Sequence, residues 1–367
     1  MPKDTARGAG AAPRAATPAP PTTSPVTTPV PQASPDGEVE MMRLVAELYY
    51  LREQSQSTIA DLTGFSISKV SRLLSQAREA GVVRITVQPA PDQLAEQAAA
   101  MAAALGISDA HVTPGRGDDP ARATRLCAVA AAPWLAALVP EAGVLGLAGG
   151  YTISALVDAL PHRRCAHLTI VPLVGGWDPE TPHLDINELA RRAAAQLECR
   201  YQLLHAPGRL DSIEVKQALM ADSAIRITTD YWDRLSLALI GISGGPLADP
   251  GYTTVMERLE RADRRRLASR GVVGDMVGHL FDASGRIVDD PASERTIAAP
   301  VSALRRAARV IAIAAGRHKV EGIIGACRTG LIHTLVTDQP TAEAITRRAG
   351  DASRRPARRA HRVDARR

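Results

Sequence analysis

The sequence predicts an α/β protein in which a small helical unit precedes a doubly wound, largely parallel sheet. The chain has 367 residues, which allows a small unit plus a core of about 200 to 250 residues. Hydrophobic residues make up 45% of the chain but aromatic residues only 3%, so Ala, Val, Leu and Ile must build the core. That mixture is typical of helices stacked on a buried parallel sheet. Short β-rich runs also alternate with helical stretches, which implies right-handed crossovers between parallel strands.

The predicted strands and helices follow one another over most of the second part of the chain. The expected strands are 110–113, 143–147, 168–174, 201–204, 235–242, 310–315 and 332–337. Helical patterns over 152–160, 187–197 and 319–328 lie between them. A hairpin-like insert is expected over 281–288, with its turn at Ser284 and Gly285.

Two tails of biased composition flank the part that is expected to fold. Residues 1–37 contain nine Pro among Ala, Thr, Ser and Gly, which predicts a disordered leader. Residues 347–367 carry a net charge of +7, so the formal charge of +5 leaves −2 for residues 1–346. We expect a disordered Arg-rich tail, which either touches phosphates non-specifically or is simply a solvated terminus. A helical unit over 38–88 and a larger domain over 89–346 are expected between the tails.

Cysteine spacing and hydropathy exclude several classes of protein. The four cysteines are far apart and form no C-x-x-C pair, which argues against a zinc site or a disulfide framework and fits a reducing cytosol. No apolar run approaches the roughly 18 to 20 residues of a membrane helix, and the N-terminus has no signal-peptide core. We therefore expect a cytoplasmic protein with no membrane partner, no metal and no cofactor.

Two helices joined by a tight turn are predicted over 56–77. Gly64 supplies a turn where a positive φ costs little, Phe65 fills the corner, and the Ser66 hydroxyl caps the second helix. The apolar spacing of the second helix predicts one buried face. The residues expected to face inward are Ile59, Ala60, Val70, Leu73, Leu74 and Ala77.

The opposite face of the second helix has the composition of a DNA-reading surface. Arg and Gln can pair with base edges in the major groove, while Ser and Lys hold phosphates. The expected DNA-binding residues are Ser66, Ser68, Lys69, Ser71, Arg72 and Gln76. Arg78 and Arg84 are expected to extend the positive rim towards a strand over 82–87. The alternative is the polar face of an interaction module that binds no DNA.

The segment over 48–87, LYYLREQSQSTIADLTGFSISKVSRLLSQAREAGVVRITV, resembles the DNA-binding domain of the SorC (DeoR-like) family of sugar-responsive bacterial regulators. The similarity continues to about Ala344. Later landmarks are LGLAGGYT, VPLVGG, DINELARR, GDMVGHLFDASGRIVD and VIAIAAGRHKVEGIIGACRTGLIHTLVTD. The resemblance implies a helix-turn-helix regulator that binds a DNA operator as a homo-oligomer, with a tetramer built mainly through the effector domains. It also implies a Rossmann-like effector domain similar to sugar-phosphate isomerases and glucosamine-phosphate deaminases.

Glycine loops after two strands mark the expected effector pocket. The loop 149–152 follows an apolar strand and opens a helix, where free N–H groups can hold an anion or a hydroxyl; a plain turn is the alternative. A second pair, Gly175 and Gly176, follows the next strand, and the polar candidates follow strand ends or glycines. The resemblance implies effector contacts at Gly150, Tyr151, Thr152, Asp185, Asn187, Asp275 and Lys319. The full expected set is Gly149, Gly150, Tyr151, Thr152, Gly175, Gly176, Asp185, Asn187, Asp275 and Lys319.

Two departures from the family pattern reduce the positive charge of this pocket. The usual Trp-Gly-Arg-Thr loop is Gly-Gly-Tyr-Thr here, and Val174 stands where some phosphosugar-sensing relatives have a basic residue. We expect a sugar, a polyol or a sugar phosphate as effector, and the reduced charge leaves open whether it is phosphorylated.

Two other function classes compete with the regulator. An isomerase or deaminase would use Asp275 or Asp185 as base and Lys319 as electrophile, but it has no use for a DNA-reading unit. A DNA-free oligomeric scaffold would have to bury the polar face of the second helix. We therefore expect no enzyme and no catalytic residues.

Overall fold

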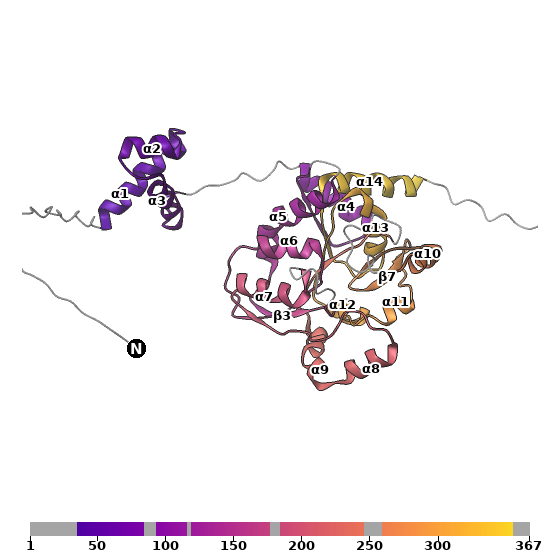
Figure 1. The fold of residues 1–367 in the computed structure, drawn as a ribbon. Helices are drawn as coiled ribbons and strands as arrows, with labels where there is room; N and C mark the ends of the chain where they lie inside the picture. The colour runs from indigo at the N-terminus through magenta and orange to yellow at the C-terminus, as the bar shows by residue number, and fades with distance from the viewer. Residues whose placement is uncertain (1–34, 84–92, 116–118, 177–183, 246–258, 355–367) are drawn as a thin grey trace, which may run out of the picture. The chain divides into compact units, whose positions relative to one another are not determined.

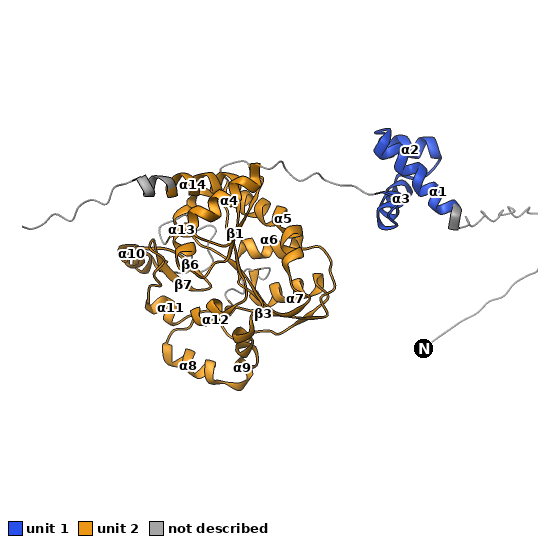
Figure 2. Cartoon of the chain, turned by 180° about the vertical axis from the view of Figure 1, so that it is seen from behind, with its two compact units in different colours: residues 1–89 blue, residues 90–367 orange. Residues whose placement is uncertain are grey.

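The computed structural model describes residues 35–83, 93–115, 119–176, 184–245 and 259–354, which belong to two compact units. The first unit spans residues 1–89 and the second spans residues 90–367 (Figure 2). Each unit has its own hydrophobic core, since no buried residue of the helical unit belongs to a cluster of the second unit in the described part of the chain.

Helices make up the first unit. They are α1 (Pro35–Ala46), which continues as the π-helix η1 (Glu47–Leu51), α2 (Gln56–Thr63) and α3 (Ile67–Glu79). All six residues expected to face inward are buried, together with Met42, Val45 and Ala46 of α1. Helix α1 begins at Pro35, inside the segment expected to be a disordered leader. A proline is tolerated in the first turn of a helix, because the N–H groups there make no hydrogen bond within the helix. Residues 84–87 of the expected strand, Arg84 included, lie outside the described residues.

A parallel sheet forms the centre of the second unit. Within the described residues it has seven strands in the order β1-β9-β8-β5-β2-β3-β4, and every neighbouring pair is parallel. The strands are β1 (Asp109–Thr113), β2 (Ala142–Leu147), β3 (His167–Pro172), β4 (Arg200–Tyr201), β5 (Leu237–Gly241), β8 (Val310–Ile313) and β9 (Thr334–Asp338). Each of them overlaps a predicted strand, so the α/β class with a mostly parallel sheet is confirmed.

Helices cover both faces of this sheet (Figure 1). In β5, Leu237 and Leu239 belong to one core cluster, while Ala238 and Ile240 belong to the other. The first face packs against α5 (Pro120–Leu138), α6 (Tyr151–Ala159) and α7 (Ile186–Gln196). The second packs against α4 (Gln93–Leu105), α12 (Val301–Arg306), α13 (Val320–Arg328) and α14 (Gln339–Arg354). Burial on both sides explains why the strands are apolar at successive positions instead of alternating.

A hairpin-like segment lies where it was predicted, over 281–288, and the sequence reasoning missed a second antiparallel pair just before it. The antiparallel pair is β6 (Val272–Met276) with β7 (His279–Asp282), and the turn between them is Val277 and Gly278, with φ of 52° and 76°. A β-branched residue at positive φ is unusual, so a rule that looks for Gly, Asn, Asp or Ser passes over it. The predicted segment 281–288 contains one isolated antiparallel bridge, Phe281 to Ile287.

Shorter elements complete the second unit. Helices α8 (Ile213–Ala221), α9 (Ser223–Thr229) and η3 (Asp230–Arg234) lie between β4 and β5, and α10 (Arg261–Ser269) and α11 (Pro291–Glu294) flank the hairpin. Helix α14 extends to Arg354, so the first part of the expected disordered tail is helical. The helix is held because Ala342 and Ile345 are buried in the core. In the part of the chain that is described, no helix has the length and apolarity needed to cross a membrane.

Candidate functional site

Capped helix ends fix the direction of α3 within the first unit. The Ser55 hydroxyl accepts a hydrogen bond from the Thr58 N–H at 3.1 Å at the start of α2, and Gly64 ends that helix with φ of +70°. The Ser66 hydroxyl accepts from the Lys69 N–H at 3.2 Å at the start of α3. An N-cap of this kind contributes about 1 kcal/mol, so the two helices are held at a defined turn.

The outward face of α3 carries the polar side chains expected to read DNA. Ser66, Ser68, Ser71 and Arg72 are exposed, and Gln76 is half-buried. The ammonium of Lys69 lies 4.0 Å from the centroid of the Phe65 ring. A cation–π contact therefore keeps this ammonium against the Phe65 ring. Arg72 is therefore the long cation that projects from this face.

The connections of the sheet diverge at one position along its carboxyl edge. After β2 the chain passes through α6 to β3 on one face, whereas after β5 it crosses the other face through α12 to β8. Strands β2 and β5 are neighbours, so the loops that follow them lie at a topological switch point. Ligands of open α/β sheets bind at such a point.

The loop after β2 leaves its backbone open. Gly150 caps α6 without a side-chain hydrogen bond and has φ of 111°, a conformation that favours glycine. A Cβ at Gly149 would meet no atom within 4 Å, so a ligand can approach the main chain here. Tyr151 is half-buried, while Thr152 is turned into the core with 6% of its surface exposed.

The glycines after β3 are needed for packing. The Gly175 N–H donates to the Ile297 carbonyl at 3.0 Å, and the Gly176 N–H donates to the Ala206 carbonyl at 2.9 Å. A Cβ at Gly175 would lie 2.5 Å from the Pro207 carbonyl oxygen. Both N–H groups are thus engaged within the protein, and close backbone contact explains the first glycine.

The two polar residues that follow this loop serve α7. Asp185 caps the helix, and its Oδ1 accepts from the N–H groups of Asn187 and Glu188, both at 3.0 Å. The amide of Asn187 donates to the Leu204 carbonyl at 3.1 Å and accepts from the Leu204 N–H at 2.9 Å. The Asn187 amide thus ties α7 to the segment after β4, while the second oxygen of Asp185 lies near Gly176.

Asp275 and Lys319 are buried ionisable residues that influence each other electrostatically beside the switch point. Their exposed fractions are 4% and 3%. Lys319 is the last residue of the short helix η6 (Arg317–Lys319), which follows Gly316 at φ of 107°. Asp275 is on β6, and its carboxylate accepts from the Ser243 hydroxyl. The backbones are also linked, because the Asp275 N–H donates to Ser243 Oγ at 2.9 Å and the Ser243 N–H donates to the Asp275 carbonyl at 3.0 Å.

Burial shifts both members of this pair towards their neutral forms. It lowers the pKa of Lys319 to about 8, against the opposing attraction of Asp275 and Cys127. It raises the pKa of Asp275, while the Ser243 hydroxyl, the Gly278 N–H and the Lys319 ammonium favour the carboxylate. Burial also raises the pKa of Cys127 to about 12, so this side chain stays a thiol at neutral pH. Shifted groups of this kind gather at functional sites.

Ser243 is a site residue that the sequence reasoning missed. It follows β5 together with Gly244 and Gly245, which repeats the pattern of an apolar strand followed by small residues seen after β2. Its carbonyl oxygen would lie 2.7 Å from a Cβ at Gly274 and 2.6 Å from a Cβ at Gly322. The main chain at Gly274 and at Gly322 therefore packs directly against this loop.

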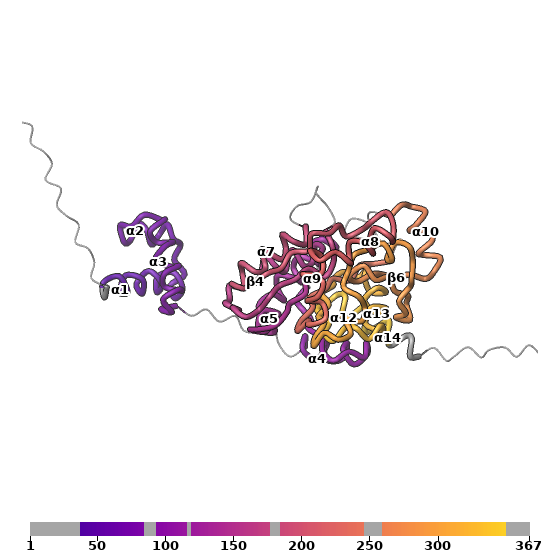
Figure 3. Tube along the Cα trace, turned by 90° about the horizontal axis from the view of Figure 1, so that it is seen from below, coloured from indigo at the N-terminus to yellow at the C-terminus, as the bar shows by residue number. Residues whose placement is uncertain are grey.

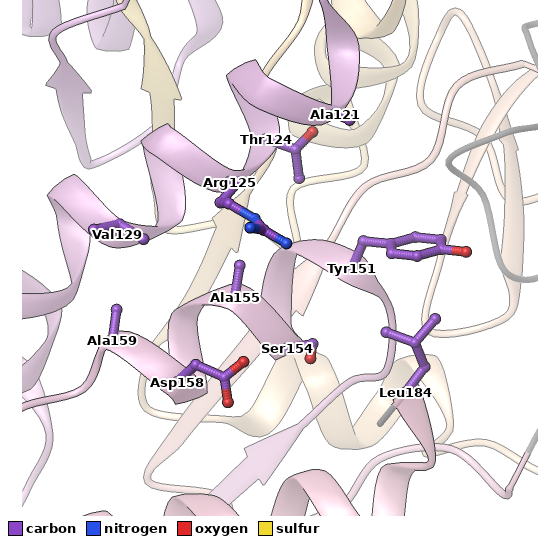
Figure 4. A pocket seen from close by; sticks show the side chains of 10 residues that line it. All are labelled: Ala121, Thr124, Arg125, Val129, Tyr151, Ser154, Ala155, Asp158, Ala159 and Leu184. Carbon is purple, nitrogen blue, oxygen red and sulfur yellow. The ribbon is translucent and has the colours of Figure 1, made fainter. Parts of the chain in front are cut away.

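A cavity of about 390 Å³ lies between α5 and α6 (Figure 4). Its polar lining includes Thr124, Arg125, Tyr151, Ser154 and Asp158. Arg192 of α7 pairs with Asp158 and donates to Ser154 Oγ at 3.2 Å. The volume is that of a small-molecule site, and Tyr151 connects this cavity to the loop after β2.

The model of the sugar-binding domain family matches residues 90–347. The chain belongs to this family. The similar proteins include the sorbitol operon regulator of Klebsiella pneumoniae, which is 28% identical over 310 residues, 84% of this chain and 98% of that protein. The erythritol catabolism regulatory protein EryD of Brucella abortus is 25% identical over 84% of this chain and 97% of its own length.

Solved structures of the family agree. The full-length sorbitol operon regulator SorC from Klebsiella pneumoniae has a TM-score of 0.67 and 28% identity, covering 84% of this chain and 98% of that one. A sor operon regulator from Shigella flexneri has a TM-score of 0.63 and 28% identity over 69% of this chain and 99% of that one. The predicted resemblance to the SorC family is confirmed, and these relatives are named as regulators, not enzymes.

The pKa of Lys319 predicts a pH dependence of stability that a Lys319→Met variant lacks. Between about pH 8 and 10.5 the unfolded state keeps a proton on Lys319 that the folded state has lost. The free energy of unfolding of the parent should therefore rise with pH, by up to about 1.4 kcal/mol per unit, relative to the variant. Urea titrations of both proteins from pH 7 to 10 measure this difference. A difference that does not change with pH would contradict the prediction.

Proposed function

We propose that this chain is a DNA-binding transcriptional regulator whose operator binding is controlled by a sugar, polyol or sugar-phosphate effector. The observation that carries the proposal is the extent of the match to the sorbitol operon regulator, 84% of this chain and 98% of that protein. The second unit, residues 90–367, is a smaller share of the chain than this, so the match reaches into the helical unit. The likeness therefore includes the part that precedes the sugar-binding domain.

The DNA-binding half of the proposal rests on α2, its turn and α3. These elements form a helix-turn-helix in which α3 enters the major groove with its exposed face towards the bases. Support comes from the capped turn, the buried Val70, Leu73 and Leu74 face, and the exposed Ser68, Ser71 and Arg72 on the other side. Arg72 is assigned to base reading, and the serines to phosphates.

The effector-binding half rests on the loops at the switch point. The open backbone at Gly149 and the N-terminal N–H groups of α6 suit a hydroxyl or an anionic group. Lys319 and Asp275, buried on the other side, suit the donor and acceptor pattern of sugar hydroxyls. The enzyme alternative, with Asp275 or Asp185 as base, is not favoured, because the relatives are named as regulators.

We further propose a cytoplasmic homo-oligomer, a tetramer joined mainly through the second unit. One small helix-turn-helix gives little affinity, so two copies on a pseudo-palindromic operator are expected. Multi-angle light scattering at micromolar concentration should give a mass of four chains, about 156 kDa from 38.9 kDa each. A mass of one chain, with and without DNA, would refute the oligomer.

Replacing Arg72 by Ala should weaken operator binding by about 1 to 3 kcal/mol, roughly 5- to 150-fold, without unfolding the first unit. The side chain is exposed, so its loss removes base contacts and no core packing. Arg43→Ala, an exposed arginine on α1, is the control with the same change in charge. The measurement is a gel shift on genomic fragments captured with the parent. Equal affinities of the Arg72 variant and the parent would remove this residue from the interface.

Replacing Lys319 by Met should leave operator binding intact and abolish the response to effector, because the methionine fills the space without an ammonium. A panel of pentitols, hexitols and their phosphate esters first identifies the compound that changes operator binding by the parent. Lys216→Met is the matched control, since its Nζ donates to the Glu294 carbonyl on α11, away from the switch point. A Lys319 variant that responds at the same effector concentration as the parent would exclude the assignment.

A further inference from the structure

The cavity of about 390 Å³ between α5 and α6 has neither Asp275 nor Lys319 in its lining (Figure 4). Helices α5, α6 and α7 lie side by side on one face of the sheet (Figure 1), and α5 and α7 also share one side of the unit when it is seen from below (Figure 3). The space stays open because Ala121 on α5 and Ala155 and Ala159 on α6 are too short to fill it. Its volume suits a small organic molecule.

One positive charge at this cavity has no partner within the described part of the chain. Asp158 pairs with Arg192 of α7, so its carboxylate is already neutralised. The side chain of Arg125 makes no ion pair and no hydrogen bond with any residue that the structure describes. Figure 4 shows it extending from α5 towards α6. These two guanidiniums and one carboxylate leave a net charge of +1, so the cavity is suited to an anion.

The charge at the cavity favours a carboxylate over a phosphate ester. A guanidinium binds a carboxylate through two parallel, charge-assisted hydrogen bonds. One carboxylate balances the net charge of +1, which leaves no unpaired charge in the occupied site. A phosphate ester carries close to two negative charges at neutral pH, so the second would stay uncompensated beside Asp158. The ligand expected here is therefore a monoanion.

Apolar side chains indicate what the rest of this ligand is made of. Val129 of α5 and Leu184, which precedes α7, belong to the lining together with the aromatic residue Tyr151. Val129 is 47% exposed, so a ligand that covers it gains free energy from the burial of apolar surface. Small-molecule sites combine such walls with a few polar groups that orient the ligand. These walls fit an aliphatic or aromatic body better than a densely hydroxylated one.

We propose that the cavity between α5 and α6 is a second ligand site, which binds a small monocarboxylic acid with an aliphatic or aromatic body. Arg125 binds the carboxylate, while Val129, Leu184 and Tyr151 contact the body of the acid. This ligand differs in chemistry from the sugar, polyol or sugar phosphate proposed for the switch point. Tyr151 is also the first residue of α6, so the bound acid lies against the loop after β2.

Direct binding to the full chain without DNA tests this site, so the result does not depend on the proposed function. The probes are hexanoate and benzoate, each beside its neutral amide, and phenyl phosphate, which puts a dianion on the ring of benzoate. Calorimetric titration at constant ionic strength should detect at least one carboxylate and neither amide. Arg125→Met removes an exposed side chain and should weaken that carboxylate about 10- to 150-fold. Arg122→Met, an exposed arginine of α5 outside the lining, is the matched control.

The proposal is overturned if neither carboxylate binds the parent, or if Arg125→Met binds it as tightly as the parent does. Equal binding of an amide, or tighter binding of phenyl phosphate than of benzoate, contradicts the assignment to a carboxylate. Lys319→Met should keep the parent affinity, and a loss in that variant alone would place the acid at the switch point instead. Light scattering should give every variant the mass of the parent. A lower mass for Arg125→Met would assign the cavity to a contact between copies of the chain.

Discussion

Burial of both faces is the constraint on which the second unit depends. A parallel sheet needs a crossover for each strand, and the crossovers here cover one side with α5, α6 and α7 and the other with α4, α12, α13 and α14. The backbone of the central strands can then meet a ligand only where the strands end. After β2 the chain continues towards β3, and after β5 it continues the opposite way along the sheet towards β8, although the two strands are parallel. The loops after these two strands are therefore the ones that face each other without a crossover between them.

Much of this arrangement follows from local patterns in the chain. Short β-rich runs marked every strand of the sheet, and the spacing of Val70, Leu73 and Leu74 marked the buried face of α3. Candidate loops were found by the same logic, because a glycine after an apolar run is a local signal. The loop at Gly149 and the buried pair Asp275 and Lys319 are therefore residues that the sequence alone could nominate.

Roles that depend on a distant partner could not be found in this way. Asn187 was expected to face a ligand, yet both ends of its amide are bound to Leu204, 17 residues further along the chain. Ser243 was overlooked, although it holds Asp275 from 32 positions away. The turn between β6 and β7 was also missed, because Val277 adopts a positive φ that residue preferences disfavour. For Asn187 and Ser243, a contact with a residue far along the chain decides the role.

The close backbone contacts around Ser243 also limit how the site at the switch point can change in the course of evolution. Any side chain at Gly274 or Gly322 would collide with the Ser243 carbonyl, so the wall beside β5 is fixed by main chain and tolerates little substitution. The opposite wall has room, because a Cβ at Gly149 meets nothing. Members of the family that acquire a new ligand preference are therefore expected to do so by exchanging residues of the loop after β2. The loop after β5 should be inherited almost unchanged.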